Sequence, residues 1–554
     1  MLRVLKYRSN QAKCSVVLIS LLLIAVCAFA QTPDWQWAIG AGGSDHDYGE
    51  AITVDDAGNS YVTGYFSETA TFGSNSITSN GDVDIFVAKM DINGNWVWAI
   101  RAGGIDRDSG FGIVVDDIGN SYVTGSFEGS ATFGLHSLTS EGGKDIFVAK
   151  IDQNGVWQWA TNAGGTNPDY GTGITMDTAG NSYVTGSFEG SATFGLHSLT
   201  SEGSKDIFVA KIDQNGVWQW ATSAGGIDRD SGFGIVVDDI GNSYVTGSFE
   251  GSATFGSYSL TGYGSDDIFV AKIDQNGVWQ WATSAGGTNP DYGTGITIND
   301  ESNCYMTGIF YFTATFGSYS ITSSGMADIC VAKIDQNGVW QWAEKAGGSS
   351  TDHGEAITID DAGNSYITGG FEGVAYFGSD SLTSYGGRDI FVAKIDSTGM
   401  WEWSINSGGI LSDIGCSITI NNENSCWVTG FFEDISTFGT HSITSSGGSD
   451  IFVAKLESPV SSDPEIMPDA FNLSNHPNPF NTNTTINYSL KQDSPVSLEI
   501  YNLKGQLVEI LLNDNIQAGD HKIEWDCQRM PSGVYFLKMK TGNEESTRKM
   551  ILLK

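Results

Sequence analysis

The stretch Asp206-Ile-Phe-Val-Ala-Lys-Ile-Asp-Gln-Asn-Gly-Val-Trp-Gln-Trp-Ala-Thr-Ser-Ala-Gly-Gly226 decides the fold of this chain. It predicts a β-hairpin. A β-branched and aromatic run is followed by an Asp-Gln-Asn-Gly turn and a return strand that contains Trp218 and Trp220. Asn215-Gly216 suits the turn because Asn and Gly adopt positive φ at low cost.

The Trp-x-Trp pair of this hairpin recurs in seven copies, each 61 residues after the last. The copies are Trp35/Trp37, Trp96/Trp98, Trp157/Trp159, Trp218/Trp220, Trp279/Trp281, Trp340/Trp342 and Trp401/Trp403. A regular period of this length indicates stacked or radially arranged units. The sequence between successive pairs predicts four strands per unit, with motifs Gly-x-x-Ile-Thr-Val-Asp, Ser-Tyr-Val-Thr-Gly-x-Phe, Asp-Ile-Phe-Val-Ala-Lys and Val-Trp-Gln-Trp-Ala. The insert between the second and third strands has room for a small hairpin.

The second and third strands carry consecutive apolar residues, which predicts that both faces of each sheet are covered. Four-stranded units placed around an axis meet this requirement, and the expected fold is an all-β propeller. The array begins at Trp35, inside a fourth strand, and ends at Lys455, at the end of a third strand. We therefore expect the N-terminal strand to complete the last of seven blades, because this pairing removes two open sheet edges.

The charge of the chain limits the classes of molecule that are expected to bind it. The 554 residues include 27 Lys and Arg against 65 Asp and Glu, a formal net charge of −38. Such a field disfavours nucleic acid and anionic membrane surfaces and favours cations or cationic partners. A solvated acidic surface explains the same composition without any partner.

Residues 1–30 predict a signal peptide. Basic residues between Arg3 and Lys13 precede an apolar run over 16–26 and the cleavage site Ala28-Phe29-Ala30. The apolar run is short for a bilayer, so no transmembrane span is expected in the mature chain. Cys27 leaves a lipoprotein signal open, although Val26 is bulkier than such a site usually allows.

Five cysteines remain after the signal peptide: Cys304, Cys330, Cys416, Cys426 and Cys527. They show no metal-type spacing, and we expect buried thiols, with a Cys416–Cys426 bridge as the alternative.

The repeated phrase Gly-Gly-x4-Asp, Ile-Thr-Val-Asp-Asp-x-Gly-Asn-Ser-Tyr-Val-Thr-Gly and Asp-Ile-Phe-Val-Ala-Lys resembles the bacterial β-propeller repeat family called SBBP, from Trp35 to Lys455. The resemblance implies a fold. It implies no shared activity.

The segment after the repeats has a different pattern. Ser458 to Pro468 has the composition of a linker, and six alternating strands over 485–553 predict a small Ig-like antiparallel sandwich. The segments Asn478-Pro479-Phe480-Asn481, Val496 to Gly505, Ser532 to Phe536 and Lys549 to Lys554 resemble the type A sorting domain of the type IX secretion system.

This second resemblance implies export by the type IX machinery to the outside or to the outer-membrane surface of a Gram-negative bacterium. Asn478, Pro479, Phe480, Lys549 and Lys554 are the residues that it marks as a sorting signal. The expected organisation is a signal peptide at 1–30, a seven-bladed propeller at 31–457, a linker at 458–472 and the sorting domain at 473–554.

The clearest polar feature is an Asp four residues after each Gly-Gly, at the entrance to the strand expected to be innermost. These candidate ligand-binding residues are Asp47, Asp108, Asp169, Asp230, Asp291, Asp352 and Asp413. A second Asp stands two residues earlier in Asp45/Asp47, Asp106/Asp108 and Asp228/Asp230 (Asn167 and Asn289 in two other copies), which makes pairs suited to Ca²⁺. The alternative, which we favour, is that each Asp accepts backbone N–H bonds in its own turn.

The tryptophan pairs have two interpretations. Residues i and i+2 are expected to face the same side of a strand, where they could form a sugar-stacking platform. Packing between neighbouring units is the interpretation that we favour, because large aromatic side chains usually anchor cores.

The sequence favours a binding or scaffolding module with an unknown glycan or protein ligand. Residues 102–134 are identical to 224–256, whereas an active site needs a few unique groups held in one place. The alternative is a polysaccharide-degrading enzyme whose site lies in the irregular loops around Tyr311, Phe312, Glu433 and Asp434.

Overall fold

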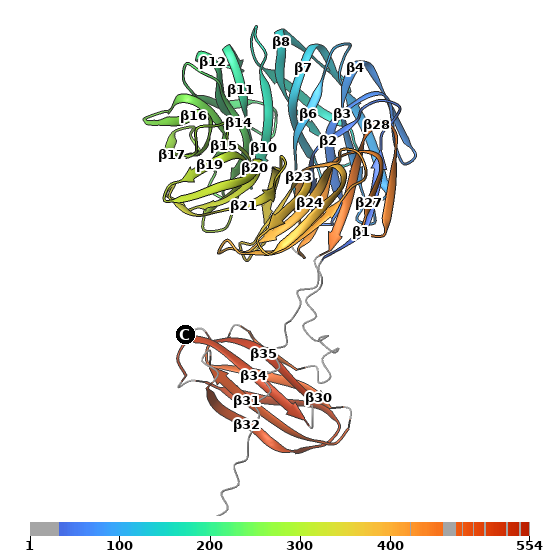
Figure 1. Cartoon of the computed structure of the whole chain (residues 1–554). Helices are drawn as coiled ribbons and strands as arrows, with labels where there is room; N and C mark the ends of the chain where they lie inside the picture. Colours follow the sequence, from blue (N-terminus) through green and yellow to red (C-terminus); the bar gives the residue numbers. More distant parts are fainter. Residues whose placement is uncertain are drawn as a thin grey trace, which may run out of the picture. The chain divides into compact units, whose positions relative to one another are not determined.

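The computed structural model describes residues 33–421, 423–457, 473–478, 480–490, 492–502, 506–527, 530–541 and 544–552. Its assigned elements are β-strands throughout, and the described residues include no helix suited to crossing a membrane. The chain divides into two compact parts between residues 459 and 460, here called the repeat region and the C-terminal region (Figure 1). The predicted signal peptide and linker lie outside the described residues.

One repeat unit illustrates all of them. Strands β10 (Tyr170–Met176), β11 (Ser182–Phe194), β12 (His197–Ile212) and β13 (Trp218–Ala224) form an antiparallel sheet in that order. The predicted insert continues β11 and β12, which pair as far as Phe194 and His197. A register shift between Glu189 and Ser191 marks a β-bulge there. The insert is therefore the outer half of one long hairpin.

The other units repeat this order. The strands are β2 (Tyr48–Val54), β3 (Ser60–Phe72), β4 (Asn75–Met90) and β5 (Trp96–Ala102) in unit 1; β6 (Ser109–Val115), β7 (Ser121–Phe133), β8 (His136–Ile151) and β9 (Trp157–Ala163) in unit 2; β14 (Asp230–Val237), β15 (Ser243–Phe255), β16 (Tyr258–Ile273) and β17 (Trp279–Gly286) in unit 4; β18 (Tyr292–Ile298), β19 (Cys304–Phe316), β20 (Tyr319–Ile334) and β21 (Trp340–Gly348) in unit 5; β22 (His353–Ile359), β23 (Ser365–Phe377), β24 (Asp380–Ile395) and β25 (Trp401–Ser407) in unit 6. The β10–β13 sheet is unit 3. Short pairings of β17 with β19 and of β21 with β23 join units 4 to 6 into one extended sheet.

Unit 7 is assembled from the two ends of the repeat region. Its strands are β26 (Ile414–Ile420), β27 (Ser425–Phe438), β28 (His441–Glu457) and the N-terminal β1 (Asp34–Ala41). Strand β1 pairs antiparallel with β28, with Trp37 opposite Lys455 and Ala41 opposite Ile451. The predicted pairing of the leading Trp strand with the last strand is confirmed.

The first strands of the units contact one another in a closed series. The order is β2, β6, β10, β14, β18, β22, β26 and back to β2. The backbone N–H of Asp47, before β2, donates to the carbonyl of Ser449 on β28 at 2.7 Å. Units 7 and 1 are therefore joined by the same kind of contact that joins consecutive units, such as Asp108 N–H to the Val83 carbonyl at 2.8 Å.

The apolar core lies between units. Tyr183, Ile207 and Val209 of unit 3 pack in one buried cluster with Val245 and Phe249 of unit 4. Residues of both sheet faces are buried on the second and third strands, as their consecutive apolar residues predict. Each unit thus stabilises its neighbours through the apolar surface it removes from water.

The Trp-x-Trp pairs contact both neighbouring units. Trp157 Nε1 donates to the Arg101 carbonyl of the preceding unit at 3.3 Å, and Trp159 Nε1 donates to the Gln214 carbonyl of the following unit at 3.1 Å. The packing interpretation is supported by these contacts. The expectation that both indoles face the same side is wrong, because a bulge beside the pair sets Trp157 and Trp159 opposite consecutive residues of β8.

The C-terminal region contains two sheets. One has the order β29 (Ser474–His476), β30 (Asn483–Leu490), β33 (Gly519–Asp526), and the other β32 (Leu507–Ile516), β31 (Ser494–Asn502), β34 (Gly533–Thr541), β35 (Glu544–Leu552). Ile486 and Trp525 of the first sheet and Leu498, Leu537 and Met550 of the second belong to one buried cluster. The two sheets therefore share a core.

Cys304, Cys330, Cys416 and Cys426 form no disulfide, so the alternative of a Cys416–Cys426 bridge is not observed in the structure. Cys304, Cys330, Cys426 and Cys527 are buried, as expected of small apolar side chains.

Candidate functional site

The recurring turn aspartates are fully buried. The exposed fraction is 0% for Asp47, Asp108, Asp169, Asp230, Asp291, Asp352 and Asp413. In unit 3, Asp169 Oδ2 accepts the N–H of Gly165 at 2.8 Å and Oδ1 accepts the N–H of Glu189 at 3.0 Å. The same two bonds recur at the other turn aspartates. These are the backbone hydrogen bonds that the turn interpretation predicts. Through them each aspartate connects the Gly-Gly segment to the β-bulge of the second strand.

A second buried carboxylate stands beside each turn aspartate, a contact between units that the sequence did not indicate. These residues open the Asp-Ile-Phe-Val-Ala-Lys motif and belong to the preceding unit: Asp84, Asp145, Asp206, Asp267, Asp328, Asp389 and Asp450. The position of these residues at the start of a strand motif indicates a turn-capping or weak ion-pairing role. Asp145 Oδ2 does accept the N–H of Glu141 at 3.3 Å, but its Oδ1 is buried without a hydrogen-bond partner. The Oδ1 atoms of the other six are unpartnered too.

A glycine separates the two carboxylates. A Cβ added to Gly164 would lie 2.8 Å from Asp145 Oδ1 and 2.9 Å from Asp169 Oδ2. Gly225 stands in the same way between Asp206 and Asp230. Only a residue without a side chain leaves room for both acids, which explains the first Gly of each Gly-Gly pair. We call such a pair a junction pair.

Burial raises the pKa of both members. It raises the pKa of Asp169 from 3.8 to about 7, against the opposing effect of its backbone hydrogen bonds, and that of Asp145 to about 6. The pKa is raised to about 7 for Asp47, Asp108, Asp230 and Asp291 and to about 6 for Asp352 and Asp413, with burial the largest cause throughout. A junction pair therefore holds a proton far more readily than two exposed carboxylates do.

Two junction pairs also contact a cation. Arg101 lies 3.1 Å from Asp84 Oδ2, and Lys345 lies 3.5 Å from Asp328 Oδ2. The equivalent position is Asn162 in unit 2 and Ser223 in unit 3. Among the described residues, these two junctions alone have such an ion pair at the second carboxylate.

The paired aspartates Asp45/Asp47, Asp106/Asp108 and Asp228/Asp230 provide few side-chain ligands for a metal ion. Asp45 is exposed beside buried Asp47, and Asp106 and Asp228 are half-buried beside buried Asp108 and Asp230. Within the described ranges, no group of three or more His, Cys, Asp or Glu side chains has metal-binding geometry. The Ca²⁺ hypothesis for these pairs therefore stays a prediction, with at most a partial set of side-chain ligands.

The irregular loops of the enzyme alternative lie on different units. Tyr311 and Phe312 are on β19 of unit 5, and Glu433 and Asp434 are on β27 of unit 7. Phe312 and Asp434 have φ of 58° and 59°, where units 2, 3, 4 and 6 have glycine. The two loops are equivalent places in separate units, and unit 6 lies between them in the series.

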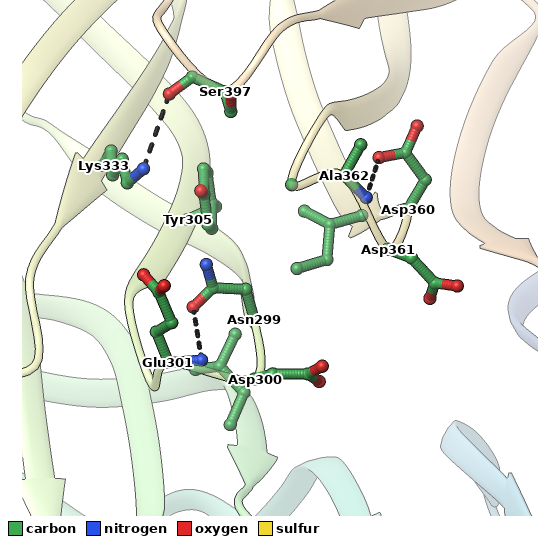
Figure 2. A pocket seen from close by; sticks show the side chains of 12 residues that line it. Asn299, Asp300, Glu301, Tyr305, Lys333, Asp360, Asp361, Ala362 and Ser397 are labelled. Carbon is green, nitrogen blue, oxygen red and sulfur yellow. Dashed lines mark hydrogen bonds between the residues drawn. The ribbon is translucent and has the colours of Figure 1, made fainter. Parts of the chain in front are cut away.

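A pocket of about 480 Å³ lies between units 5 and 6 at the turns that follow their first strands (Figure 2). Asn299 occupies the place that Asp177 has in unit 3, so Lys333 lacks the ion pair that Lys211 forms with Asp177 at 3.5 Å. Lys333 Nζ instead donates to the Ser397 carbonyl at 3.5 Å. Four acidic residues, Asp300, Glu301, Asp360 and Asp361, are among those that line this pocket.

The predicted sorting residues are described only in part. Phe480 is buried, lies 5.7 Å from the Trp525 ring and forms a parallel bridge with Leu552. Asn478 is exposed. Pro479 and Lys554 lie outside the described residues, and of Lys549 only the backbone in β35 is described.

Comparisons with known proteins agree with this division. A model for a secretion system C-terminal sorting domain matches residues 474–553. A model for the SBBP beta-propeller repeat matches residues 38–65 and 158–187.

Similar proteins are distant. The uncharacterized WD repeat-containing protein L264 of Acanthamoeba polyphaga mimivirus is 23% identical over 500 residues, covering 72% of this chain and 36% of that protein. The regulatory protein FlaEY of Caulobacter vibrioides is 25% identical over 372 residues, covering 61% of this chain and 38% of that protein. The chain thus spans little more than a third of the curated relatives it matches.

Among solved structures, PorZ, a surface component of the type IX secretion system of Porphyromonas gingivalis, aligns with a TM-score of 0.35 and 13% identity over 92% of this chain and 60% of that one. A similarity at this level is not evidence of a shared function. The two family matches show that the chain contains SBBP beta-propeller repeats and a secretion system C-terminal sorting domain, in agreement with its four-stranded units and its C-terminal sheets.

Proposed function

We propose that this chain is a secreted or cell-surface propeller of seven blades that serves as a binding or scaffolding module. Units 1 to 7 are the blades, within residues 31–457. Support comes from the closed series of first strands and from the β1–β28 pairing. An Ig-like sandwich over 473–554, behind a linker at 458–472, would then be the export signal, and its two sheets with one shared core support that assignment.

The observation that carries the binding role is the equivalence of the units. Each junction has the same buried pair of acids and the same backbone bonds, and the cations beside these pairs, Arg101 and Lys345, lie in different units. A catalytic site needs a nucleophile, an acid or base and an orienting group in one place. A ring of near-identical blades suits repeated contacts with an extracellular glycan or protein.

The binding role is tested with the full chain on a glycan and protein array, followed by incubation with any glycan that binds. We expect retention of at least one ligand and no change in its length. New reducing or unsaturated ends on the glycan would contradict a purely binding role and favour the polysaccharide-degrading alternative.

The export route is tested by deleting residues 473–554 in a cell that has the type IX machinery. The sorting domain indicates secretion or cell-surface localisation, so the shortened protein is expected to stay inside the outer membrane. Its appearance in the medium or on the surface at the level of the full chain would contradict the route.

A further inference from the structure

Two lysines of neighbouring units converge on one tyrosine. Lys205 Nζ lies 4.3 Å from the ring centroid of Tyr170, and Lys144 Nζ lies 5.9 Å from the same centroid. Tyr170 begins β10 of unit 3, Lys205 is on β12 of the same unit, and Lys144 is on β8 of unit 2. The backbone fixes this approach, because the Asp169 N–H donates to the Lys144 carbonyl at 2.6 Å.

The cations at this place are not neutralised by ion pairs. Glu128 faces Lys144 across the β7–β8 pair, and Glu189 faces Lys205 across the β11–β12 pair. Even so, neither lysine comes within 4 Å of a carboxylate among the described residues. Most other lysines of the repeat region have such a partner or lie over a tyrosine at the far ends of the third strands, as Lys211 does over Tyr183.

Two arginines add to the same positive field. Burial, and next the charge of Arg107, lowers the pKa of Lys144, which Glu128, Asp108 and Asp82 oppose. Burial, and next the charge of Arg229, lowers the pKa of Lys205, which Glu189 and Asp169 oppose. Arg107 and Arg229 are exposed. The charges of an arginine and of at least two carboxylates therefore act on each lysine, and the two ammonium groups over Tyr170 lie in a chain whose net charge is −38.

The arrangement is confined to one place in the repeat. At the equivalent tyrosine of unit 5, Tyr292, the residue from the preceding unit is Asp266, whose Oδ2 accepts the Tyr292 hydroxyl at 3.3 Å. At Tyr48 of unit 1, the equivalent residue is Ser449, 3.5 Å from the Tyr48 hydroxyl. The lysine pair is therefore a feature of units 2 and 3 and not a requirement of the fold.

We infer that the surface formed by Lys144, Tyr170 and Lys205 binds the acidic groups of an extracellular glycan. The tyrosine ring holds the two ammonium groups in place through cation–π contacts. Half-buried ammonium groups without a carboxylate partner gain charge-assisted hydrogen bonds from a sugar carboxylate or sulfate. The acidic remainder of the chain repels long, dense polyanions such as nucleic acid, which favours short or sparsely charged sugar acids.

This inference rests on the proposed binding role and is tested by calorimetry on the full chain. The probes are an oligogalacturonate, which carries carboxylates, a chondroitin sulfate oligosaccharide, which also carries sulfates, and neutral maltohexaose. We expect at least one acidic probe to bind, more weakly at higher salt, and the neutral probe not to bind. The double variant Lys144→Gln/Lys205→Gln should weaken that binding by roughly tenfold or more, since hydrogen bonds to charged groups are strong.

The matched control is Lys150→Gln/Lys211→Gln, which removes two charges from the same two strands at their far ends. It should leave the affinity for the acidic probe within about twofold, apart from a small loss of long-range attraction. Equal losses in both double variants, or no binding of either acidic probe by the wild-type chain, would overturn the inference. A wild-type chain that binds the neutral probe or an array protein, but no acidic sugar, would overturn this site and leave the binding role intact.

Discussion

The junctions between units fall into two kinds that differ by one side chain. Between units 1 and 2, the pair Asp84 and Asp108 has Arg101 at 3.1 Å. Between units 2 and 3, the pair Asp145 and Asp169 has Asn162 in that place and no cation. The backbone bonds of the turn aspartate are the same in both. The difference shows that the turn needs the aspartate in both junctions, whereas the second carboxylate has a cation beside it in one junction and none in the other.

The largest expected effect is the loss of a turn aspartate, which should not distinguish the two kinds of junction. Asp108→Ala and Asp169→Ala each leave two buried N–H groups without an acceptor, at a cost of about 1–3 kcal/mol per group. We expect each variant to lower the free energy of unfolding by a similar amount in urea denaturation. A stable Asp169→Ala protein beside an unfolded Asp108→Ala protein would contradict the shared role.

Both kinds of junction should make the stability of the chain depend on pH, because the pKa of Asp108 and that of Asp169 are both raised to about 7. The pKa of Asp169 is about 7 in the folded chain and its ordinary value is 3.8, so the folded state binds more protons than the unfolded state between these values. Its contribution is fully present below about pH 4 and is lost as the pH rises through about 7. We expect the chain to melt at a higher temperature at pH 5.5 than at pH 8.

Asp145→Asn sharpens this test, because it replaces the unpartnered carboxylate Oδ1 by an uncharged group. The variant should be more stable than the wild type at pH 8 and should lose part of the pH dependence. Asp84→Asn, which breaks the Arg101 ion pair, is the control and should show no such gain. An equal gain in stability at pH 8 in Asp145→Asn and Asp84→Asn would show that the two kinds of junction do not differ.

Exchange of the cation is expected to have a smaller effect. Arg101→Asn should cost about 1 kcal/mol at pH 8, and Asn162→Arg should recover a similar amount at the neighbouring junction, because a partly exposed ion pair is worth little more. Both changes in the free energy of unfolding should be smaller at pH 5.5, because Asp108 and Asp169 have a pKa of about 7 and each junction pair then holds a proton. Thermal melts of the two single variants and of the double exchange measure this directly.

Removal of divalent cations is expected to have the smallest effect. The pairs Asp45/Asp47, Asp106/Asp108 and Asp228/Asp230 each offer one buried carboxylate whose oxygens already accept backbone N–H groups. We expect EDTA to shift the melting temperature by about one degree or less, since a weak ligand below its dissociation constant adds little stability. A drop of several degrees that Ca²⁺ restores would instead establish the Ca²⁺ hypothesis.

The sequence predicted what depends on the spacing within one unit. The four strands, the turn role of residues such as Asp169 and the pairing of β1 with β28 follow from periodicity and from where the array begins and ends. The six strands predicted over 485–553 correspond to β30 to β35, which run from Asn483 to Leu552, because the alternation of this region is regular.

The remainder depends on contacts between units. Asp145 and Asp169 are 24 residues apart, and only the packing of unit 3 on unit 2 brings them together around Gly164. Lys144 and Lys205 are one full repeat apart and meet over Tyr170 for the same reason. The bulge that turns Trp157 and Trp159 to opposite neighbours is a property of the pairing with β8, and no residue pattern within β9 announces it.

The closed ring is tested most directly by a disulfide across the joining strands. Ala38 on β1 lies opposite Ala454 on β28, so a double variant Ala38→Cys/Ala454→Cys should cross-link on mild oxidation, seen as a mobility shift on non-reducing gels. The matched control Ala38→Cys/Ala271→Cys places the second cysteine at the equivalent position of unit 4 and should not cross-link. Cross-linking of the first pair alone is the predicted result. A failure of Ala38→Cys/Ala454→Cys to cross-link, or equal cross-linking in the control, would contradict a ring closed by the N-terminal strand.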